Sequence, residues 1–158
     1  MFNGIIQNIG IVRELNCRNK GVQLLIKSDI KLKKKENGLS ISCDGVCLTL
    51  ESFKRDIFKF YISNETLLRT KFKFIKIGDA INLEKPLKFN DKISGHYVQG
   101  HVDTIAVVNR IKKIDKSSTI EFKLNKKFIK YLVEKASITI NGVSLTICNI
   151  KKIALKFL

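Results

Sequence analysis

Two stretches of the chain, ISCDGVCLTL at Ile41–Leu50 and ITINGVSLTI at Ile138–Ile147, are near copies of each other. Each places a two-residue turn signal, Asp-Gly or Asn-Gly, between short runs in which apolar residues alternate with others. This arrangement is typical of a β-hairpin with a tight turn. The sequence therefore predicts two similar hairpins, one in each half of the chain.

A second pair of segments extends the similarity beyond the hairpins. GIIQNIGIVREL at 4–15 aligns with GHVDTIAVVNRI at 100–111 at an offset of 96 residues, and the hairpins align at an offset of 97. Two segments in the same order at nearly the same offset indicate a tandem duplication. We therefore expect two units, residues 1–97 and residues 98–158.

Both units are expected to be built from β-strands. Short helical turns are predicted at 64–68, with Asn64 as a possible cap, and at 126–133. Several short strands with one or two helical turns favour a small closed barrel in each repeat. Besides the two hairpins, strands are predicted at Val22–Ile26, Ile57–Ile62, Ala80–Leu83 and Thr119–Leu124.

The second unit is expected to be incomplete. At the offset of the hairpins Leu158 aligns with Tyr61, so the segments SNETLLRT and GDAINLEK of the first unit have no counterpart. A barrel that lacks its last strands exposes an unpaired edge and an open core. A partner that covers this edge, or a poorly folded second unit, would follow.

Composition narrows the class of protein. The chain has 158 residues, 44% of them apolar, and no run of about 18 apolar residues that would span a membrane. Its start, MFNGIIQNIG, lacks the basic and apolar regions of a signal peptide. We therefore expect a cytoplasmic protein whose four cysteines are reduced thiols.

The net charge of +16 is a feature of many nucleic-acid-binding proteins. Here the positive residues are almost all lysines, they are spread along the whole chain, and no aromatic-arginine stacking motif accompanies them. The run Lys33-Lys34-Lys35 is interpreted as a solvated loop. Nucleic acid is therefore not the expected partner.

Small polar residues recur at matching positions after each turn. Strand alternation places Cys47 and Thr49 on one face of the first hairpin, and Ser144 and Thr146 on one face of the second. A half-buried strand with one face in water would show the same alternation. The recurrence at equivalent positions favours instead the lining of two related ligand sites.

A metal site is not expected. His96 and His101 are five residues apart, so on a strand they would face opposite ways. Cysteines and histidines with the spacing of a zinc site are absent from the sequence. His101 follows Gly100, which aligns with Gly4, and a glycine there would let the backbone approach a ligand closely.

Six segments taken together resemble riboflavin synthase, the tandem lumazine-binding-domain family: MFNGII, DGVCLTL, NETLLRT, GDAINLE, GHYVQGHVD and EKASITINGVSLT. The resemblance covers nearly the whole chain. It implies an all-β fold of two tandem antiparallel Greek-key six-stranded barrels, the second incomplete here, with one pterin-like ligand in each. It also implies a homotrimer, although the C-terminal helix that holds the family's trimer has no counterpart before Leu158.

The implied reaction uses two molecules of 6,7-dimethyl-8-ribityllumazine and moves a four-carbon unit between them. Its products are riboflavin and 5-amino-6-ribitylamino-pyrimidinedione, the reaction being the last step of riboflavin biosynthesis, and it needs no metal or organic cofactor. Two identical ligands would explain the two copies of the hairpin. A lumazine- or flavin-binding protein without turnover, and a degraded synthase fragment, remain as alternatives.

The resemblance also implies site residues. For the chemistry it points to Phe2, His101, Ser144, Thr146 and Cys47. Asn3, Lys73 and Ala136 depart from the family's usual Thr, Gly and Gly. Ligand contacts are expected from Gly4, Ile5, Ile6, Ser40, Cys47, Leu48, Thr49, Tyr61, Ile62, Ser63, Asn64, Glu65 and Thr66 for the first site, and from Gly100, His101, Val102, Lys135, Ser144, Leu145 and Thr146 for the second site or its shared edge.

Overall fold

The computed structural model describes residues 1–18, 20–33, 36–114, 117–151 and 154–157. These residues group into two compact units. The first contains residues 1–103 together with 139–143, and the second contains the described residues of 104–138 and 144–158.

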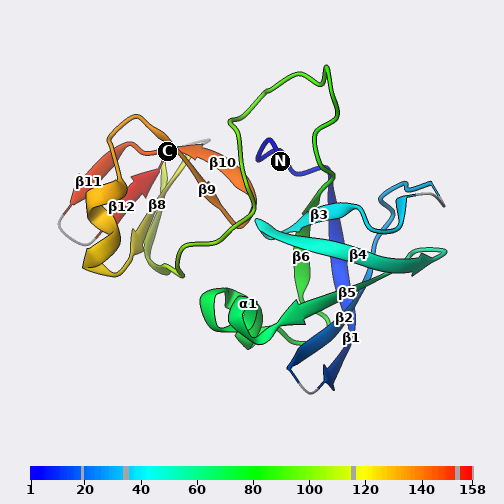
Figure 1. The fold of residues 1–158 in the computed structure, drawn as a ribbon. Helices are drawn as coiled ribbons and strands as arrows, with labels where there is room; N and C mark the ends of the chain where they lie inside the picture. The colour runs from blue at the N-terminus through cyan, green and yellow to red at the C-terminus, as the bar shows by residue number, and fades with distance from the viewer. Residues whose placement is uncertain (19, 34–35, 115–116, 152–153, 158) are drawn as a thin grey trace. The chain divides into compact units, whose positions relative to one another are not determined.

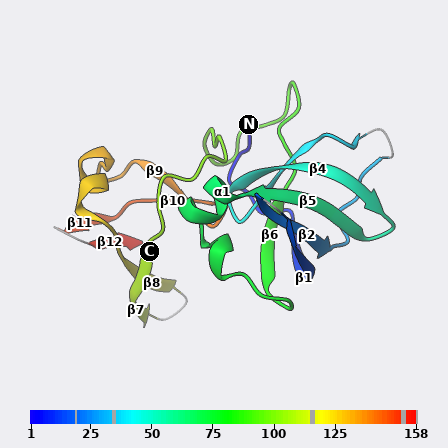
Figure 2. The same ribbon diagram turned by 60° about the horizontal axis from the view of Figure 1, so that its bottom comes forward.

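The first unit is a closed antiparallel barrel of six strands, in the order β1-β2-β5-β4-β3-β6. The strands curve around one interior in both views of the chain (Figure 1, Figure 2). This confirms the expected all-β fold and each strand predicted for this unit. The strands are β1 Asn8–Arg18, β2 Gly21–Lys27, β3 Ser40–Cys43, β4 Val46–Lys54, β5 Ile57–Ser63 and β6 Ala80–Glu84.

Alternation along the strands fills the barrel interior. On β5, Phe58, Phe60 and Ile62 are buried, while the residues between them face outward or lie at intermediate depth. Each such large apolar side chain stabilises the fold by about 1.5–3 kcal/mol relative to exposure. Bulges interrupt β1 after Val12 and β4 after Leu50, and the extra local twist helps a short sheet to close.

A helical segment follows β5. It consists of α1, Asn64–Arg69, and the 3-10 helix η2, Lys71–Phe74, whose Phe72 is buried against the barrel core. The prediction that Asn64 caps the helix is wrong. Ser63 is the extended residue before the first turn, and its Oγ accepts a hydrogen bond from the Thr66 amide at 3.2 Å.

Both predicted hairpin turns are present. Asp44 and Gly45 have φ values of 47° and 82°, and Asn141 and Gly142 have 48° and 82°. Two successive residues with positive φ give the turn that matches the twist of a two-stranded ribbon. The second turn joins β9, Ser137–Ile140, to β10, Val143–Thr146.

The strands after residue 103 repeat the order of the first unit. Two sheets form, β10-β9 and β11-β12-β8-β7, and the second has the order of β4-β5-β2-β1 in the barrel. At the repeat offset, β10 and β11 align with the two halves of β4. The strand of the second copy is therefore interrupted at the position where β4 has its bulge. The remaining elements are β7 Val107–Ile114, β8 Ser117–Lys123, the 3-10 helix η3 Lys126–Tyr131, β11 Asn149–Lys151 and β12 Ala154–Phe157.

These sheets confirm the strand and the helical turn predicted for this part of the chain. Asn125 caps η3, since its Oδ1 accepts a hydrogen bond from the Lys127 amide at 3.1 Å. Within the part of the chain that is described, the two sheets are not joined into a closed barrel. The second, incomplete barrel therefore stays a prediction.

Candidate functional site

The ladder between β4 and β5 ends before either strand does. Its register runs from Lys54 to the Leu50–Phe60 pair, whereas β4 begins at Val46 and β5 continues to Ser63. Beyond that pair, β4 stays paired with β3, and β5 stays paired with β2. We call the interval between these two unpaired ends, residues 47–49 and 61–63, the β4–β5 opening.

Backbone from residue 100 covers one end of the β4–β5 opening. The Cys47 amide donates a hydrogen bond to the Gly100 carbonyl at 2.8 Å. Gly100 has a φ of 82°, and a Cβ atom built on it would lie 2.7 Å from Cys47 Cβ and 3.0 Å from Phe2 Cε2. Only glycine therefore fits between Cys47 and the Phe2 ring.

Phe2 is fixed although it is the second residue of the chain. Its side chain has no exposed surface, and its amide and carbonyl exchange hydrogen bonds with Val98 at 2.8 and 3.0 Å. Phe2 and Cys47, two residues predicted for the chemistry, thus both lie against Gly100. Val102 packs against the same barrel core.

The predicted site residues on β3, β4 and β5 differ in whether their side chains face the barrel core or the outside. Leu48 and Ile62 belong to the buried core, so a ligand could meet only their backbone. Ser40 and Cys47 lie at intermediate depth and Thr49 is exposed. The outward face of β4 therefore presents a thiol and a hydroxyl beside the β4–β5 opening.

The start of α1 gathers hydroxyl groups at the other strand end. Ser63 Oγ lies 3.0 Å from Thr66 Oγ1, and Glu65 pairs with Arg69 at 3.1 Å on the exposed side of the helix. Asn64 is exposed. Hydroxyl groups here are suited to hydrogen bonding with a polyol or a ring amide.

The Tyr61 side chain lies over the neighbouring strand β2. Its hydroxyl group and ring lie over Gly21, and it lines a wide, open depression with Cys17, Arg18 and Lys20. The structure thus places the Tyr61 side chain at the outer end of the β1–β2 hairpin.

The N-terminal segment that carries Gly4, Ile5 and Ile6 is held by a carboxylate. Glu84 accepts hydrogen bonds from the Asn3 and Gly4 amides at 2.6 and 3.0 Å. Burial raises the pKa of Glu84, while these amides act in the opposite direction. Glu84 lies within GDAINLE but has no predicted role; the signal in the sequence is an acidic residue directly after Leu83, at the end of the strand.

In the second copy, Lys135 stands where the first copy has Gly38. Both residues adopt positive φ, 67° for Lys135 and 85° for Gly38. Both also donate from the backbone to the equivalent carbonyl, Lys135 to Ile147 and Gly38 to Leu50, each at 2.8 Å. A lysine in this conformation is strained, and such strain clusters at functional positions.

The remaining predicted residues of the second copy lie on or beside β10. Ser144 and Leu145 have intermediate exposure and Thr146 is exposed. Ser144 and Thr146 are separated by one residue on the strand, so they share a face as the sequence predicted.

The two histidines are held differently. His96 Nε2 lies 3.0 Å from Thr139 Oγ1, and the His96 amide donates to the Asn3 carbonyl at 3.1 Å. His101 is exposed and directly follows Gly100. His101 is thus the more exposed of the two, and it follows the residue whose carbonyl accepts from the Cys47 amide.

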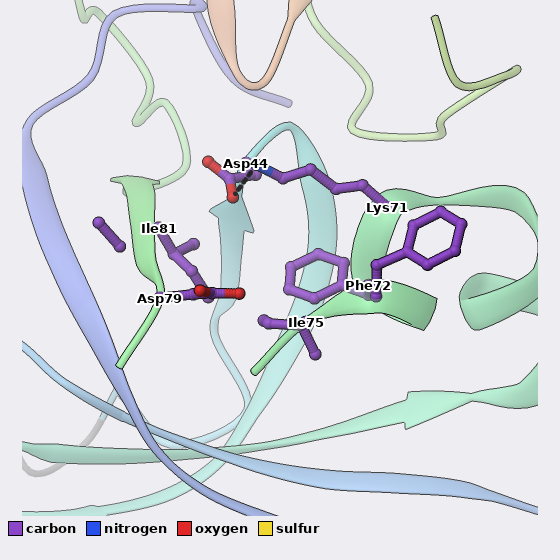
Figure 3. Close-up of a pocket in the computed structure, with 8 residues that line it drawn as sticks. Asp44, Lys71, Phe72, Ile75, Asp79 and Ile81 are labelled. Carbon is purple, nitrogen blue, oxygen red and sulfur yellow. Dashed lines mark ion pairs between the residues drawn. The ribbon is translucent and has the colours of Figure 1, made fainter. Parts of the chain in front are cut away.

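A separate cavity of about 240 Å³ lies beside η2 (Figure 3). Asp44 and Lys71 form an ion pair of 2.8 Å at one side, and Phe72, Ile75 and Ile81 supply apolar walls. Asp44 also accepts a hydrogen bond from the Asn82 amide at 2.9 Å, which ties the turn to β6. Among its described lining residues are none of those predicted for the ligand sites.

Two kinds of feature are absent from the described residues. Across the ranges that the structure describes, no helix is long and apolar enough to cross a membrane. The same ranges contain no group of three or more histidine, cysteine or acidic side chains placed to hold a metal ion.

Known proteins resemble this chain in sequence and in fold. A riboflavin synthase of Actinobacillus pleuropneumoniae is 33% identical over 147 residues, which are 93% of this chain and 68% of that protein. A riboflavin synthase of Meyerozyma guilliermondii is 38% identical over 160 residues, with 95% and 67% covered. The chain thus spans about two thirds of the length of these relatives.

Solved structures with the same fold include LumP complexed with riboflavin, at a TM-score of 0.87 and 24% identity. LumP complexed with 6,7-dimethyl-8-(1'-D-ribityl) lumazine has a TM-score of 0.84 and 23% identity. Each match covers 99% of this chain and 85% of the other. The sequence pattern of the lumazine binding domain matches twice, at residues 3–86 and 99–157. With both repeats matched over most of its length, the chain belongs to the lumazine binding domain family.

Proposed function

We propose that the first barrel binds a lumazine or a flavin at the β4–β5 opening. The observation that carries this proposal is the early end of the β4–β5 ladder, because it leaves two strand ends beside each other without mutual pairing. Backbone groups at such ends can hydrogen-bond the ring amides of a flat heterocycle. Thr49, Ser63 and Thr66 offer hydroxyl groups for the ribityl chain.

We further propose that the chain acts as a riboflavin synthase. Two molecules of 6,7-dimethyl-8-ribityllumazine would give riboflavin and 5-amino-6-ribitylamino-pyrimidinedione, which together contain all atoms of the two substrates. Removal of a proton from the C7 methyl group of one substrate needs a nearby base and stabilisation of the resulting anion. His101 is proposed as the base, with Cys47 beside it, and Phe2 shapes the same end of the opening.

Ser144 and Thr146 are proposed to hold the second substrate molecule. The matching positions of Cys47 and Thr49 in the first copy, and the strained backbone of Lys135, support this assignment. The boundary near residues 97 and 98 is part of the same proposal, whereas the homotrimer is only what the family resemblance implies. Light scattering of the purified chain tests the assembly.

A second candidate is a lumazine- or flavin-binding protein without turnover. The LumP structures favour it, because their fold is shared over nearly the whole chain and they were solved with riboflavin and with a ribityl lumazine. The two candidates share the binding step and differ in the chemical step.

One set of measurements separates them. Titration of the full chain with riboflavin, followed by quenching of flavin fluorescence, tests binding. Incubation with 6,7-dimethyl-8-ribityllumazine, followed by the appearance of riboflavin, tests turnover. Binding with turnover supports the synthase, binding alone supports the second candidate, and the absence of saturable binding overturns both.

A matched pair of variants on β4 locates the site. Thr49→Val removes a hydroxyl group beside the β4–β5 opening, and the loss of one hydrogen bond is expected to weaken riboflavin binding about 2- to 10-fold. Ser52→Ala removes an exposed hydroxyl group from the same strand where β4 is paired with β5 at Lys59. Equal effects of the two substitutions would place the ligand elsewhere.

A further inference from the structure

Glu84 is a buried carboxylate with an unusual set of partners. Its residue is 2% exposed at the end of β6, and its two oxygens accept hydrogen bonds from the Asn3 and Gly4 amides. Hydrogen bonds to a charged acceptor are about twice as strong as those between neutral groups.

These bonds fix a short segment, residues 1–7, which we call the N-terminal strap. Backbone hydrogen bonds tie its two ends, from Leu87 to the Met1 carbonyl and from Gln7 to the Leu83 carbonyl, both at 2.9 Å. Between these ends, Gly4 turns with a φ of 74°. Glu84 thus occupies the inside of the bend, where the Asn3 and Gly4 amides converge.

The strap leads directly to the proposed site. Phe2 exchanges two hydrogen bonds with Val98, and its ring lies against Gly100. Gly100 in turn accepts the hydrogen bond from the Cys47 amide. A continuous chain of contacts therefore runs from the Glu84 carboxylate through Phe2 and Gly100 to Cys47.

Barrel stability alone does not account for a carboxylate at this position. Burying a charged group costs several kcal/mol, and apolar residues of similar volume often serve a fold as well or better. What an apolar residue cannot do is bind several converging amides and so fix the conformation of the strap.

We propose that Glu84 is a positioning residue that holds the N-terminal strap so that Phe2 and Gly100 shape the Cys47 end of the β4–β5 opening. The functional part of this inference rests on the proposed binding of a lumazine or flavin there. The positional part is measurable without ligand.

The test compares Glu84→Gln with Glu14→Gln in the full chain. Glutamine fills the same volume, but its NH2 group would face one of the two backbone amides that donate to the Glu84 carboxylate. That amide would then lose its hydrogen-bond acceptor. Glu14 is an exposed carboxylate on β1 and serves as the matched control. Amide hydrogen exchange is followed at Val98 and Cys47, with Leu24 and Phe60 in the barrel core as internal references.

In Glu84→Gln we expect Val98 and Cys47 to exchange at least about tenfold faster while the core references are unchanged. Riboflavin binding is expected to weaken several-fold in the same protein. Glu84→Asp keeps the charge but withdraws the carboxylate by one methylene group, and it is expected to have the same local effect. Glu14→Gln is expected to change neither readout.

Each other outcome has a defined meaning. Unchanged exchange at Val98 and Cys47 overturns the proposal, and so does equal loss of protection at the core references in both Glu84 variants. Unchanged riboflavin affinity despite local loosening overturns the functional part. If the unmodified chain binds no riboflavin but the local loosening is seen, the proposed function fails and the positional role stands.

Discussion

Gly100→Ala tests the packing of the candidate site by adding a single methyl group. In the structure the new Cβ would lie 2.7 Å from Cys47 Cβ and 3.0 Å from both Cys47 N and Phe2 Cε2. The neighbours cannot easily move, because Cys47 is hydrogen-bonded to the Gly100 carbonyl and Phe2 to Val98. Crowding of this kind costs about 1–3 kcal/mol.

The positive φ of Gly100 adds a second cost. An alanine in the left-handed region is disfavoured by about 1–2 kcal/mol. The two costs together give about 2–5 kcal/mol, against a stability of about 5–15 kcal/mol for a typical domain. Gly100→Ala should therefore lower the free energy of unfolding by a large fraction of the total.

Gly38→Ala is the matched control. Gly38 has a φ of 85°, close to the 82° of Gly100, but a Cβ built on it would meet no atom within 4 Å. The control carries the conformational cost without the crowding, and the effect of either substitution on the unfolded chain is the same.

Urea denaturation followed by circular dichroism measures both variants. We expect Gly100→Ala to lose about 1–3 kcal/mol more than Gly38→Ala, and to bind riboflavin more weakly. For a chain of this size, the difference corresponds to roughly 2–12 °C in melting temperature. A loss no greater than that of Gly38→Ala would refute the close packing of Phe2 and Cys47 against Gly100.

Three further predictions follow from single contacts. Lys135→Gly relieves a strained backbone, so it should raise the free energy of unfolding in urea by up to about 1 kcal/mol. The same substitution should weaken lumazine binding in a titration. A lower free energy of unfolding would contradict the strain argument. Ser63→Ala removes the cap of α1 and should cost about 1 kcal/mol in the same assay, and Ser63→Thr, which keeps the hydroxyl group, should cost less. Burial raises the pKa of Glu84 above its ordinary value of 4.5, so between these two values the carboxyl group is protonated in the folded chain and ionised in the unfolded chain. The free energy of unfolding should therefore fall as the pH rises from about 4.5 through the raised pKa. Glu84→Gln should abolish that fall in urea midpoints measured across this pH range.

The sequence was a good guide wherever the signal was local or repeated. The turns at Asp44-Gly45 and Asn141-Gly142 follow from residues that adopt positive φ readily, and the alternation of β5 follows from Phe58, Phe60 and Ile62. The repeat also anticipated the shared strand order, because two copies of one pattern fold by the same pairing rules.

Long-range contacts could not be read in this way. That Glu84 accepts from the amides of Asn3 and Gly4, about 80 residues away, depends on how the barrel closes and not on any local pattern. The Asn64 cap failed for a smaller reason: Ser63 and Asn64 are both good capping residues, and only the extended backbone at Ser63 decides between them.

The burial of Phe2 has a consequence for synthesis of the chain. Ribosomes add about 5–20 residues per second, so roughly 5–20 s separate the translation of Phe2 from that of Gly100, against which its ring packs. During that interval Phe2 lacks both Val98, its backbone hydrogen-bonding partner, and Gly100, which its ring packs against. Strands of a small barrel pair in milliseconds to seconds once they are available. The beginning of the polypeptide is therefore expected to be the last part of the first barrel to fold, and the N-terminal strap to close the barrel after the strands have paired.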